Sequence, residues 1–281
     1  MNQIQAIYEQ SEYANEPHLT IHVDGKPLDK ILHELYPEKN IIGLVPTLLD
    51  WLQDSKERKL VWERIRSKQK QVVPILMCPD DVDLWCIVIN VEVEKTQQTV
   101  RWLRIGIDDG DGENMPESIG TSVEWLSKVE PMEFDKIKYN TFVSKFQTEI
   151  EKDEIGKLLD FWISRIHDNE LIPQSVKAYH FNIVASNADY KVSITGANNY
   201  NIENDQWIYQ RVFIPKEEYI SLGKHSKMWN PQEIQSIVKN GIEQFIERRI
   251  SPVTFAHTAA YITVGFDHHN LEKVTQRIFE S

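Results

Sequence analysis

Apolar residues recur along the first half of the chain with two different periods, and each period predicts one kind of element. Residues 28–35, 55–65 and 136–151 carry apolar side chains every three or four positions, which predicts helices. A further short helix is expected over 48–52. From Val72 onward the period changes to two, which predicts strands separated by turn residues. An antiparallel meander is therefore expected over 72–78, 84–94, 99–107 and 120–126, after an earlier short strand at 19–23.

The second half also combines helical and strand periods. Residues 151–175 carry a helical apolar pattern that ends at Pro173, and residues 231–249 predict another helix. Strands are expected at 178–185, 190–196, 207–214 and 260–266. The pattern predicts an α+β protein of two units, each an antiparallel sheet with helices packed on one face. The expected divisions are residues 1–150, a connecting helix and linker at 151–175, and residues 176–281.

Charge is unevenly distributed along the chain. The 281 residues have a formal net charge of −12, with 41% hydrophobic and 26% charged residues, as in ordinary globular proteins. Residues 1–150 hold 17 Lys and Arg against 26 Asp and Glu, a net charge of −9, which leaves −3 for the remainder. A strongly acidic surface repels phosphate backbones and attracts basic proteins. The composition argues against direct nucleic-acid binding and favours a basic protein partner, with solubility alone as the alternative.

The sequence gives two indications of the cellular compartment, namely its targeting signals and its cysteine content. The longest apolar runs are far shorter than the roughly 20 residues that a membrane-spanning helix needs. The first residues lack the basic and apolar regions of a secretory signal, so we expect a cytoplasmic protein without a membrane segment. Cys78 and Cys86 are expected to be buried and reduced in that compartment, with a disulfide as the alternative if an antiparallel register brings their Cα atoms within about 7 Å. Two thiols without a supporting pair of histidines argue against a structural zinc site, so no metal site is expected.

Two clusters of acidic residues interrupt the predicted meander and are candidates for a binding surface. They comprise Asp80, Asp81 and Asp83 in the first cluster, and Asp108, Asp109 and Asp111 in the second. Crowded carboxylates in the first cluster could raise one another's pKa, but a turn is the commoner explanation. The second cluster fails the EF-hand pattern, because the sixth position counted from Asp109 is Asn114 and not glycine. Either cluster is suited to bind Arg or Lys side chains of a partner.

No complete motif for a two-metal site, a nucleophile elbow or a phosphate-binding loop occurs in the sequence. Asp267-His268-His269 has the lettering of a phosphoesterase metal motif, but no matching Asp-x-Asp strand end occurs upstream, which favours a polar turn. The sequence also has no Gly-x-Ser-x-Gly elbow and no phosphate-binding glycine loop. We therefore expect no catalytic residue and no cofactor.

Eight tryptophans are many for a chain of this length. Most of them lie in periodic apolar runs and are expected in the core. Trp207 and Trp229 flank polar loops instead, so they are candidates for exposed anchors, because protein interfaces favour tryptophan.

Several segments carry a resemblance to bacterial proteins. The first half resembles a bacterial family in residues 43–51, 74–81, 102–108 and 120–126. The second half has Asp205-x-Trp207 and Gly265-Phe266-Asp267-x-x-x-Leu271. With these motifs it is similar to immunity-type proteins encoded beside polymorphic or contact-dependent toxins. The chain departs from that pattern at Asp267-His268-His269, where a more acidic end is usual.

The resemblance implies a cytoplasmic, non-enzymatic, antitoxin-like protein that occludes the active domain of a cognate toxin. A basic nuclease domain would suit its acidic face. The residues then expected to bind the partner are Asp80, Asp81, Asp83, Asp108, Asp109, Asp111 and Trp207. Two other classes stay open. One is an enzyme such as a hydrolase, in which Asp81, His180 and His268 would converge between the two halves. The other is a structural or regulatory adaptor with a broad exposed apolar patch.

Overall fold

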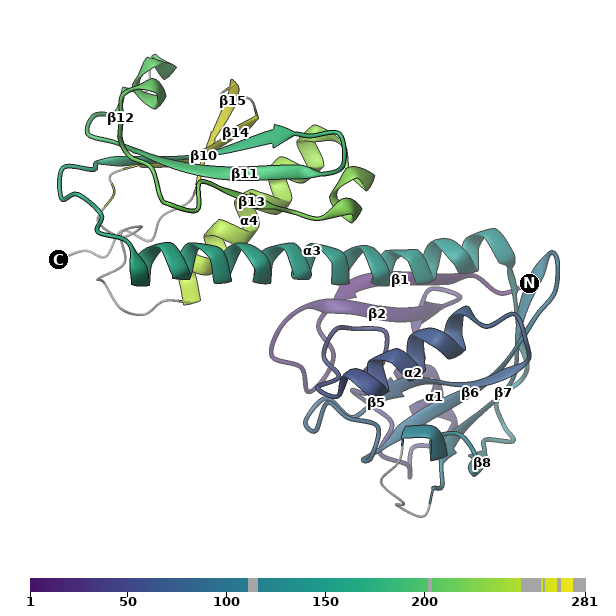
Figure 1. Cartoon of the computed structure of the whole chain (residues 1–281). Helices are drawn as coiled ribbons and strands as arrows, with labels where there is room; N and C mark the ends of the chain where they lie inside the picture. Colours follow the sequence, from purple (N-terminus) through teal and green to yellow (C-terminus); the bar gives the residue numbers. More distant parts are fainter. Residues whose placement is uncertain (111–115, 202–203, 249–258, 260, 267–268, 275–281) are drawn as a thin grey trace. The chain divides into compact units, whose positions relative to one another are not determined.

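The structure is a computed structural model that describes the chain except for residues 111–115, 202–203, 249–258, 260, 267–268 and 275–281. The chain divides into two compact units, Met1–Ile150 and Glu151–Ser281 (Figure 1). Helices and β-sheets occur in both, so the α+β class expected from the sequence is confirmed. Among the described helices, none combines the length and the apolar character that a membrane span requires.

Unit one is built around a six-stranded antiparallel sheet. Its strands follow the order β4, β5, β6, β7 and β8. Strand β8 pairs with residues 106–108 of β7, and β9 pairs with residues 99–102 of the same strand. The strands are β4 (Val45–Pro46), β5 (Gln71–Met77), β6 (Val88–Lys95), β7 (Thr99–Asp108), β8 (Val123–Trp125) and β9 (Met132–Asp135), with a 3-10 turn, η1 (Pro116–Ser118), before β8. A second antiparallel sheet contains β1 (Ile4–Glu9), β2 (His18–Val23) and β3 (Lys26–Pro27).

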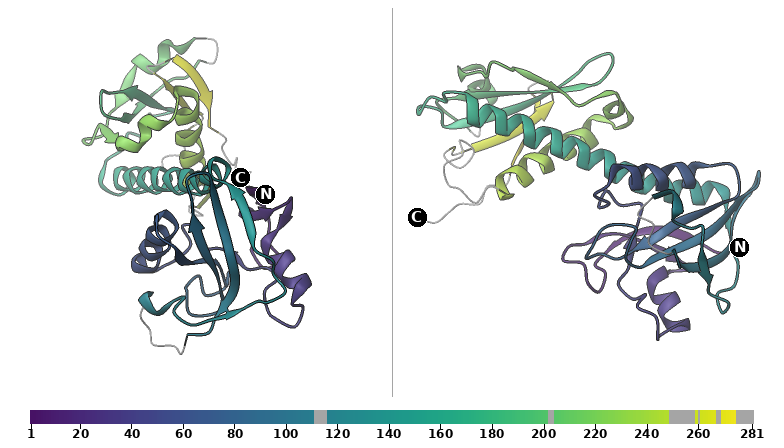
Figure 2. Two further views of the ribbon diagram at one scale, coloured as in Figure 1. Left: turned by 90° about the vertical axis from the view of Figure 1, so that its right-hand side faces the viewer. Right: turned by 60° about the horizontal axis from the view of Figure 1, so that its bottom comes forward.

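Both faces of the six-stranded sheet are covered. Residues 73–77 of β5 are all buried, as expected for a strand that has apolar neighbours on each side. Helix α2 (Ser55–Arg66) lies on one side of the sheet, and the three-stranded sheet with helix α1 (Leu28–Leu35) lies on the other (Figure 2, left). Asp54 caps α2 by accepting a hydrogen bond from the backbone N–H of Lys56 at 2.8 Å. One sheet was expected in this unit, but the structure has two.

Helix α3 (Lys136–Asn169) is continuous and contributes to both units. In unit one its aromatic face meets the sheet, where the ring of Tyr139 lies 6.4 Å from that of Trp102 in β7 and 6.0 Å from that of Phe134 in β9. In unit two its residues Leu159 and Trp162 belong to the core. The sequence analysis expected separate helical runs before and after residue 151. The structure joins them because no proline interrupts the helix before its end.

Unit two contains a mixed six-stranded sheet in the order β12, β11, β10, β14 and β15, with β13 also paired to β11. A wholly antiparallel sheet was expected, but β10 and β14 are parallel. The long connection between them contains helix α4 (Pro231–Arg248), and such a crossover makes parallel neighbours possible. The strands are β10 (Ala178–Ala185), β11 (Tyr190–Ala197), β12 (Arg211–Phe213), β13 (Tyr219–Ser221), β14 (Tyr261–Phe266) and β15 (His269–Lys273), and the 3-10 turns are η2 (Asp205–Tyr209) and η3 (Lys224–Met228).

Two expected elements take other forms. Residues 48–52 form turns and no helix, because the Thr47 hydroxyl donates to the carbonyl of Pro74 in β5 at 2.8 Å instead of capping a helix. Leu48 and Leu52 are nevertheless fully buried in the core of unit one. The strand expected over 207–214 is reduced to β12, since its first residues belong to η2.

Candidate functional site

The pairing of β5, β6 and β7 brings the two acidic clusters to one end of the six-stranded sheet. The paired residues nearest this end are Met77 with Val88 between β5 and β6, and Ile89 with Ile107 between β6 and β7. The β5–β6 connection, residues 78–87, therefore leaves the sheet at the same end as the last residue of β7. We call this region the acidic end.

The β5–β6 connection is held in a defined conformation. Val82 has a φ angle of 46°, in the left-handed region that β-branched residues rarely adopt. Its carbonyl accepts a hydrogen bond from the backbone N–H of Gln53 at 3.3 Å. The side chain of Leu84 is buried in the core, and the Asp83 carboxylate accepts from the backbone N–H of Trp85 at 2.9 Å. Such backbone strain persists only where the surroundings fix it, so these contacts hold the connection in place.

Glu57 of helix α2 is buried next to the same connection, near Asp83, Leu84 and Trp85. Only 1% of this residue is exposed, and one of its carboxylate oxygens, Oε2, is buried without a hydrogen-bond partner in the described structure. Burial raises the pKa of Glu57 above its ordinary value, and the negative charge of Asp83 adds to the effect. The neighbouring backbone of Leu84 lowers the pKa and so acts in the opposite direction.

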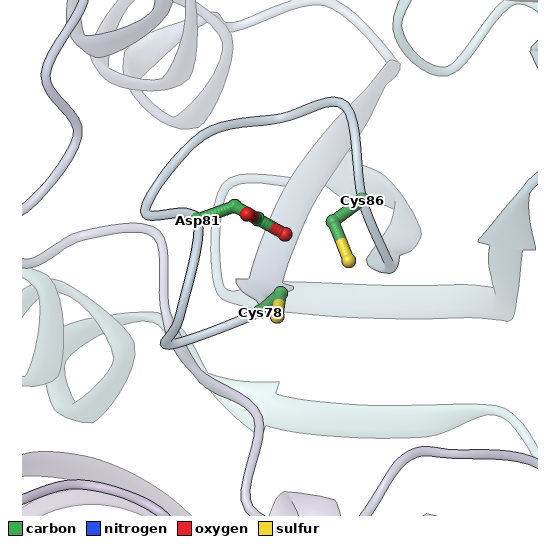
Figure 3. Close-up of side chains that lie close together, drawn as sticks. All are labelled: Cys78, Asp81 and Cys86. Atoms are coloured by element: carbon green, nitrogen blue, oxygen red, sulfur yellow. The ribbon is translucent and has the colours of Figure 1, made fainter.

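Three potential ligand groups converge within the β5–β6 connection. The thiol sulfurs of Cys78 and Cys86 and a carboxylate oxygen of Asp81 all lie within 4.8 Å of one another (Figure 3). Cys78 is half-buried and Cys86 is exposed, so the expectation that both cysteines are buried is wrong; both are free thiols. Partial burial of the sulfur, together with hydrogen bonds to Asp81 and Cys78, raises the pKa of the Cys86 thiol to about 12.

Asp108 has a structural role at the acidic end. One oxygen of its carboxylate accepts hydrogen bonds from the Asn90 side-chain amide at 2.7 Å and from the backbone N–H of Gly120 at 2.6 Å. The other oxygen accepts from the backbone N–H of Gly110 at 3.1 Å. Nearby, the Arg64 guanidinium donates to the carbonyl of Ile119 at 2.6 Å. Asp108 thus fastens the segment before β8 to the middle of the sheet.

The remaining carboxylates of the acidic end face solvent. Asp80, Asp81 and Asp109 are exposed and Asp83 is half-buried. In the part of the chain that the structure describes, no Lys or Arg forms a salt bridge with any of these four. Asp111 lies outside the described residues. The acidic end therefore presents negative charge that is not neutralised by a direct ion pair.

Trp207 lies in unit two, away from these clusters in sequence, and is only 3% exposed. Its ring packs 5.1 Å from that of Tyr200 and 6.4 Å from that of His180. Trp229 is also buried, so the expectation that these two tryptophans are exposed anchors is wrong. The short turn η2 folds Trp207 onto the sheet, which its polar flanking residues do not reveal.

His180, considered above for an enzyme, is fully buried in β10. Its Nδ1 lies 3.0 Å from the hydroxyl oxygen of Thr263 in β14. Asp81, by contrast, is exposed in unit one. His268 lies outside the described residues.

The convergence of Cys78, Asp81 and Cys86 was not predicted, because the thiols were considered without the neighbouring acids. The signal available was their placement in one short connection between two paired strands. No family model, curated protein or solved structure matches this chain. The immunity-protein resemblance therefore stays a hypothesis.

We predict that Asp108→Ala lowers the free energy of unfolding by about 1–3 kcal/mol, because it leaves the buried Asn90 amide and the Gly120 N–H without their acceptor. Asp109→Ala, at the adjacent exposed position, should change it by no more than about 0.5 kcal/mol. Urea denaturation of both variants measures the difference. Equal losses would contradict the structural role assigned to Asp108.

Glu57→Gln should change how stability depends on pH. A raised pKa means that the folded protein holds this proton more tightly, so the wild type loses stability as pH rises from below 4.5 through the folded-state pKa. The variant lacks this contribution, so its stability relative to wild type should increase over the same interval. Thermal unfolding between pH 4 and pH 8 measures the difference in stability between the variant and the wild type. Glu63→Gln, at an exposed position on the same helix, is the control. A constant difference across this range would refute the assignment.

Proposed function

We propose that this chain is a non-enzymatic binding protein that uses its acidic end to engage a basic protein. In this proposal it is a cytoplasmic immunity protein, and the partner is a cognate bacterial toxin whose active domain it occludes. A basic nuclease domain is the kind of partner that this charge suits. The observation that carries the proposal is the gathering of carboxylates at one end of the sheet, where no described Lys or Arg forms a salt bridge with Asp80, Asp81, Asp83 or Asp109.

The electrostatic argument rests on exposure and on the lack of direct neutralisation. Carboxylates that face solvent without ion-pair partners create a negative potential that accelerates the approach of a cationic protein. They also accept paired hydrogen bonds from arginine without first breaking an internal salt bridge. The Lys39 ammonium forms its salt bridge with Glu124 at 2.7 Å and not with Asp109.

Rigidity supports binding as well. The contacts of Val82 and Leu84 fix the β5–β6 connection, and Asp108 fixes Gly120, three residues before β8. A surface that is already ordered loses little conformational entropy when a partner binds. The acidic end thus combines charge with preorganisation, which is suited to fast and tight association.

The proposal is tested by a plating assay. The C-terminal domain of the protein encoded beside this chain is induced in cells with and without the full-length chain. If the neighbour is toxic and this chain restores growth, an immunity function is supported. If the neighbour kills equally in both cases or is harmless, the proposed function fails.

With that domain as the binding partner, we predict that the triple variant Asp80→Asn, Asp83→Asn, Asp109→Asn associates about tenfold more slowly at low ionic strength. The difference should shrink as salt screens the charges. Stopped-flow or surface-plasmon measurements give the rates. Asparagine preserves the acceptor that residue 83 offers to Trp85, and Asp81 is left intact because it faces the two cysteines.

A control variant separates local from overall charge. Glu63→Gln, Glu94→Gln, Glu154→Gln removes the same number of charges from surface positions on α2, β6 and α3. Its association rate should stay close to that of the wild type. Equal slowing in both variants would show that net charge, and not the acidic end, governs association.

A further inference from the structure

The β5–β6 connection brings together three groups that can bind a metal ion, and they come from a single stretch of chain. Cys78 follows the last residue of β5, Cys86 lies two residues before the first residue of β6, and Asp81 lies between them in sequence. The two sulfurs and a carboxylate oxygen lie within 4.8 Å of one another (Figure 3). Each ligand atom lies about 2.0–2.3 Å from a bound Zn²⁺, so two ligand atoms on one ion are at most about 4.6 Å apart. The 4.8 Å bound on the separations in this group is close to that limit.

The backbone around these groups is already fixed. Pairing of Met77 with Val88 sets the separation of the two ends of the connection, and Val82 and Leu84 hold its middle. A site whose ligands are held by the fold loses little entropy when an ion binds. In Figure 3 the Asp81 carboxylate and the Cys86 sulfur point toward one another, and Cys78 lies beside them at the start of the connection.

The chemistry of the ligand set selects the ion. Two thiols favour thiophilic metals, whereas Ca²⁺ and Mg²⁺ require shells of oxygen ligands. Zn²⁺ accepts sulfur and carboxylate oxygen together in a tetrahedral arrangement. Three protein ligands leave the fourth position for water or for a side chain of another molecule.

We propose that Cys78, Asp81 and Cys86 form a zinc-binding site with one open coordination position. Zn²⁺ binds to thiolates, so its uptake transfers the two thiol protons to solvent and forms two Zn–S bonds and one Zn–O bond. No electron transfer is involved. The site is independent of the proposed immunity function, because it concerns only ion uptake by the free protein.

The test uses the full-length chain, reduced with a phosphine, freed of metal by chelation and then titrated with Zn²⁺ against a chromogenic chelator. The expected stoichiometry is one ion per chain. Cys78→Ser and Cys86→Ser should each weaken binding by at least about tenfold, and Asp81→Asn should weaken it as well. Glu63→Gln, a change at an exposed carboxylate of α2 outside the group of three, should leave affinity unchanged.

Co²⁺ provides a second readout that reports ligand identity directly. Replacement of zinc by cobalt should give a thiolate-to-cobalt charge-transfer absorption and the visible bands of tetrahedral coordination. Both should disappear in the Cys78→Ala, Cys86→Ala double variant, whose folding is checked by circular dichroism. Absence of zinc uptake by the reduced wild type would overturn the proposal. Undiminished uptake by a folded double variant would overturn it too, since the ion would then bind elsewhere.

Discussion

The antiparallel pairing of β5, β6 and β7 is the constraint on which the rest of unit one depends. This register places the β5–β6 connection and the end of β7 side by side, although some 30 residues separate Asp80 from Asp109 in sequence. A shift by one residue would move every side chain of the shifted strand to the opposite face of the sheet and disrupt the packing on both sides. The acidic end is therefore a consequence of core packing, and its charge pattern persists as long as the core does.

Asp108 shows how one acidic cluster divides into structural and exposed members. Its carboxylate is occupied by backbone and side-chain donors, whereas its neighbour Asp109 faces solvent. A run of aspartates in the sequence gives no sign of this division, because the distinction depends on Asn90 and Gly120, which the fold brings close. The same fold carries the aspartate between the two cysteines toward their thiols.

Periodicity was sufficient to predict most of the regular elements, because strands such as β7 and helices such as α4 bury one set of side chains at a constant spacing. It failed for Trp207, whose burial depends on a short 3-10 turn, and for β10 and β14, whose parallel pairing depends on a long connection. The candidate site was predictable as two acidic clusters. Their meeting at one end of the sheet and the convergence of the thiols with Asp81 required the strand register.

The most direct test of the central claim, that the acidic end is a binding surface, is hydrogen exchange of the full-length chain. Exchange is measured with and without the C-terminal domain of the protein encoded beside it. The account predicts slower exchange on partner addition in residues 78–87 and in the segment that leads into β8. Protection confined to unit two, with these segments unchanged, would contradict it.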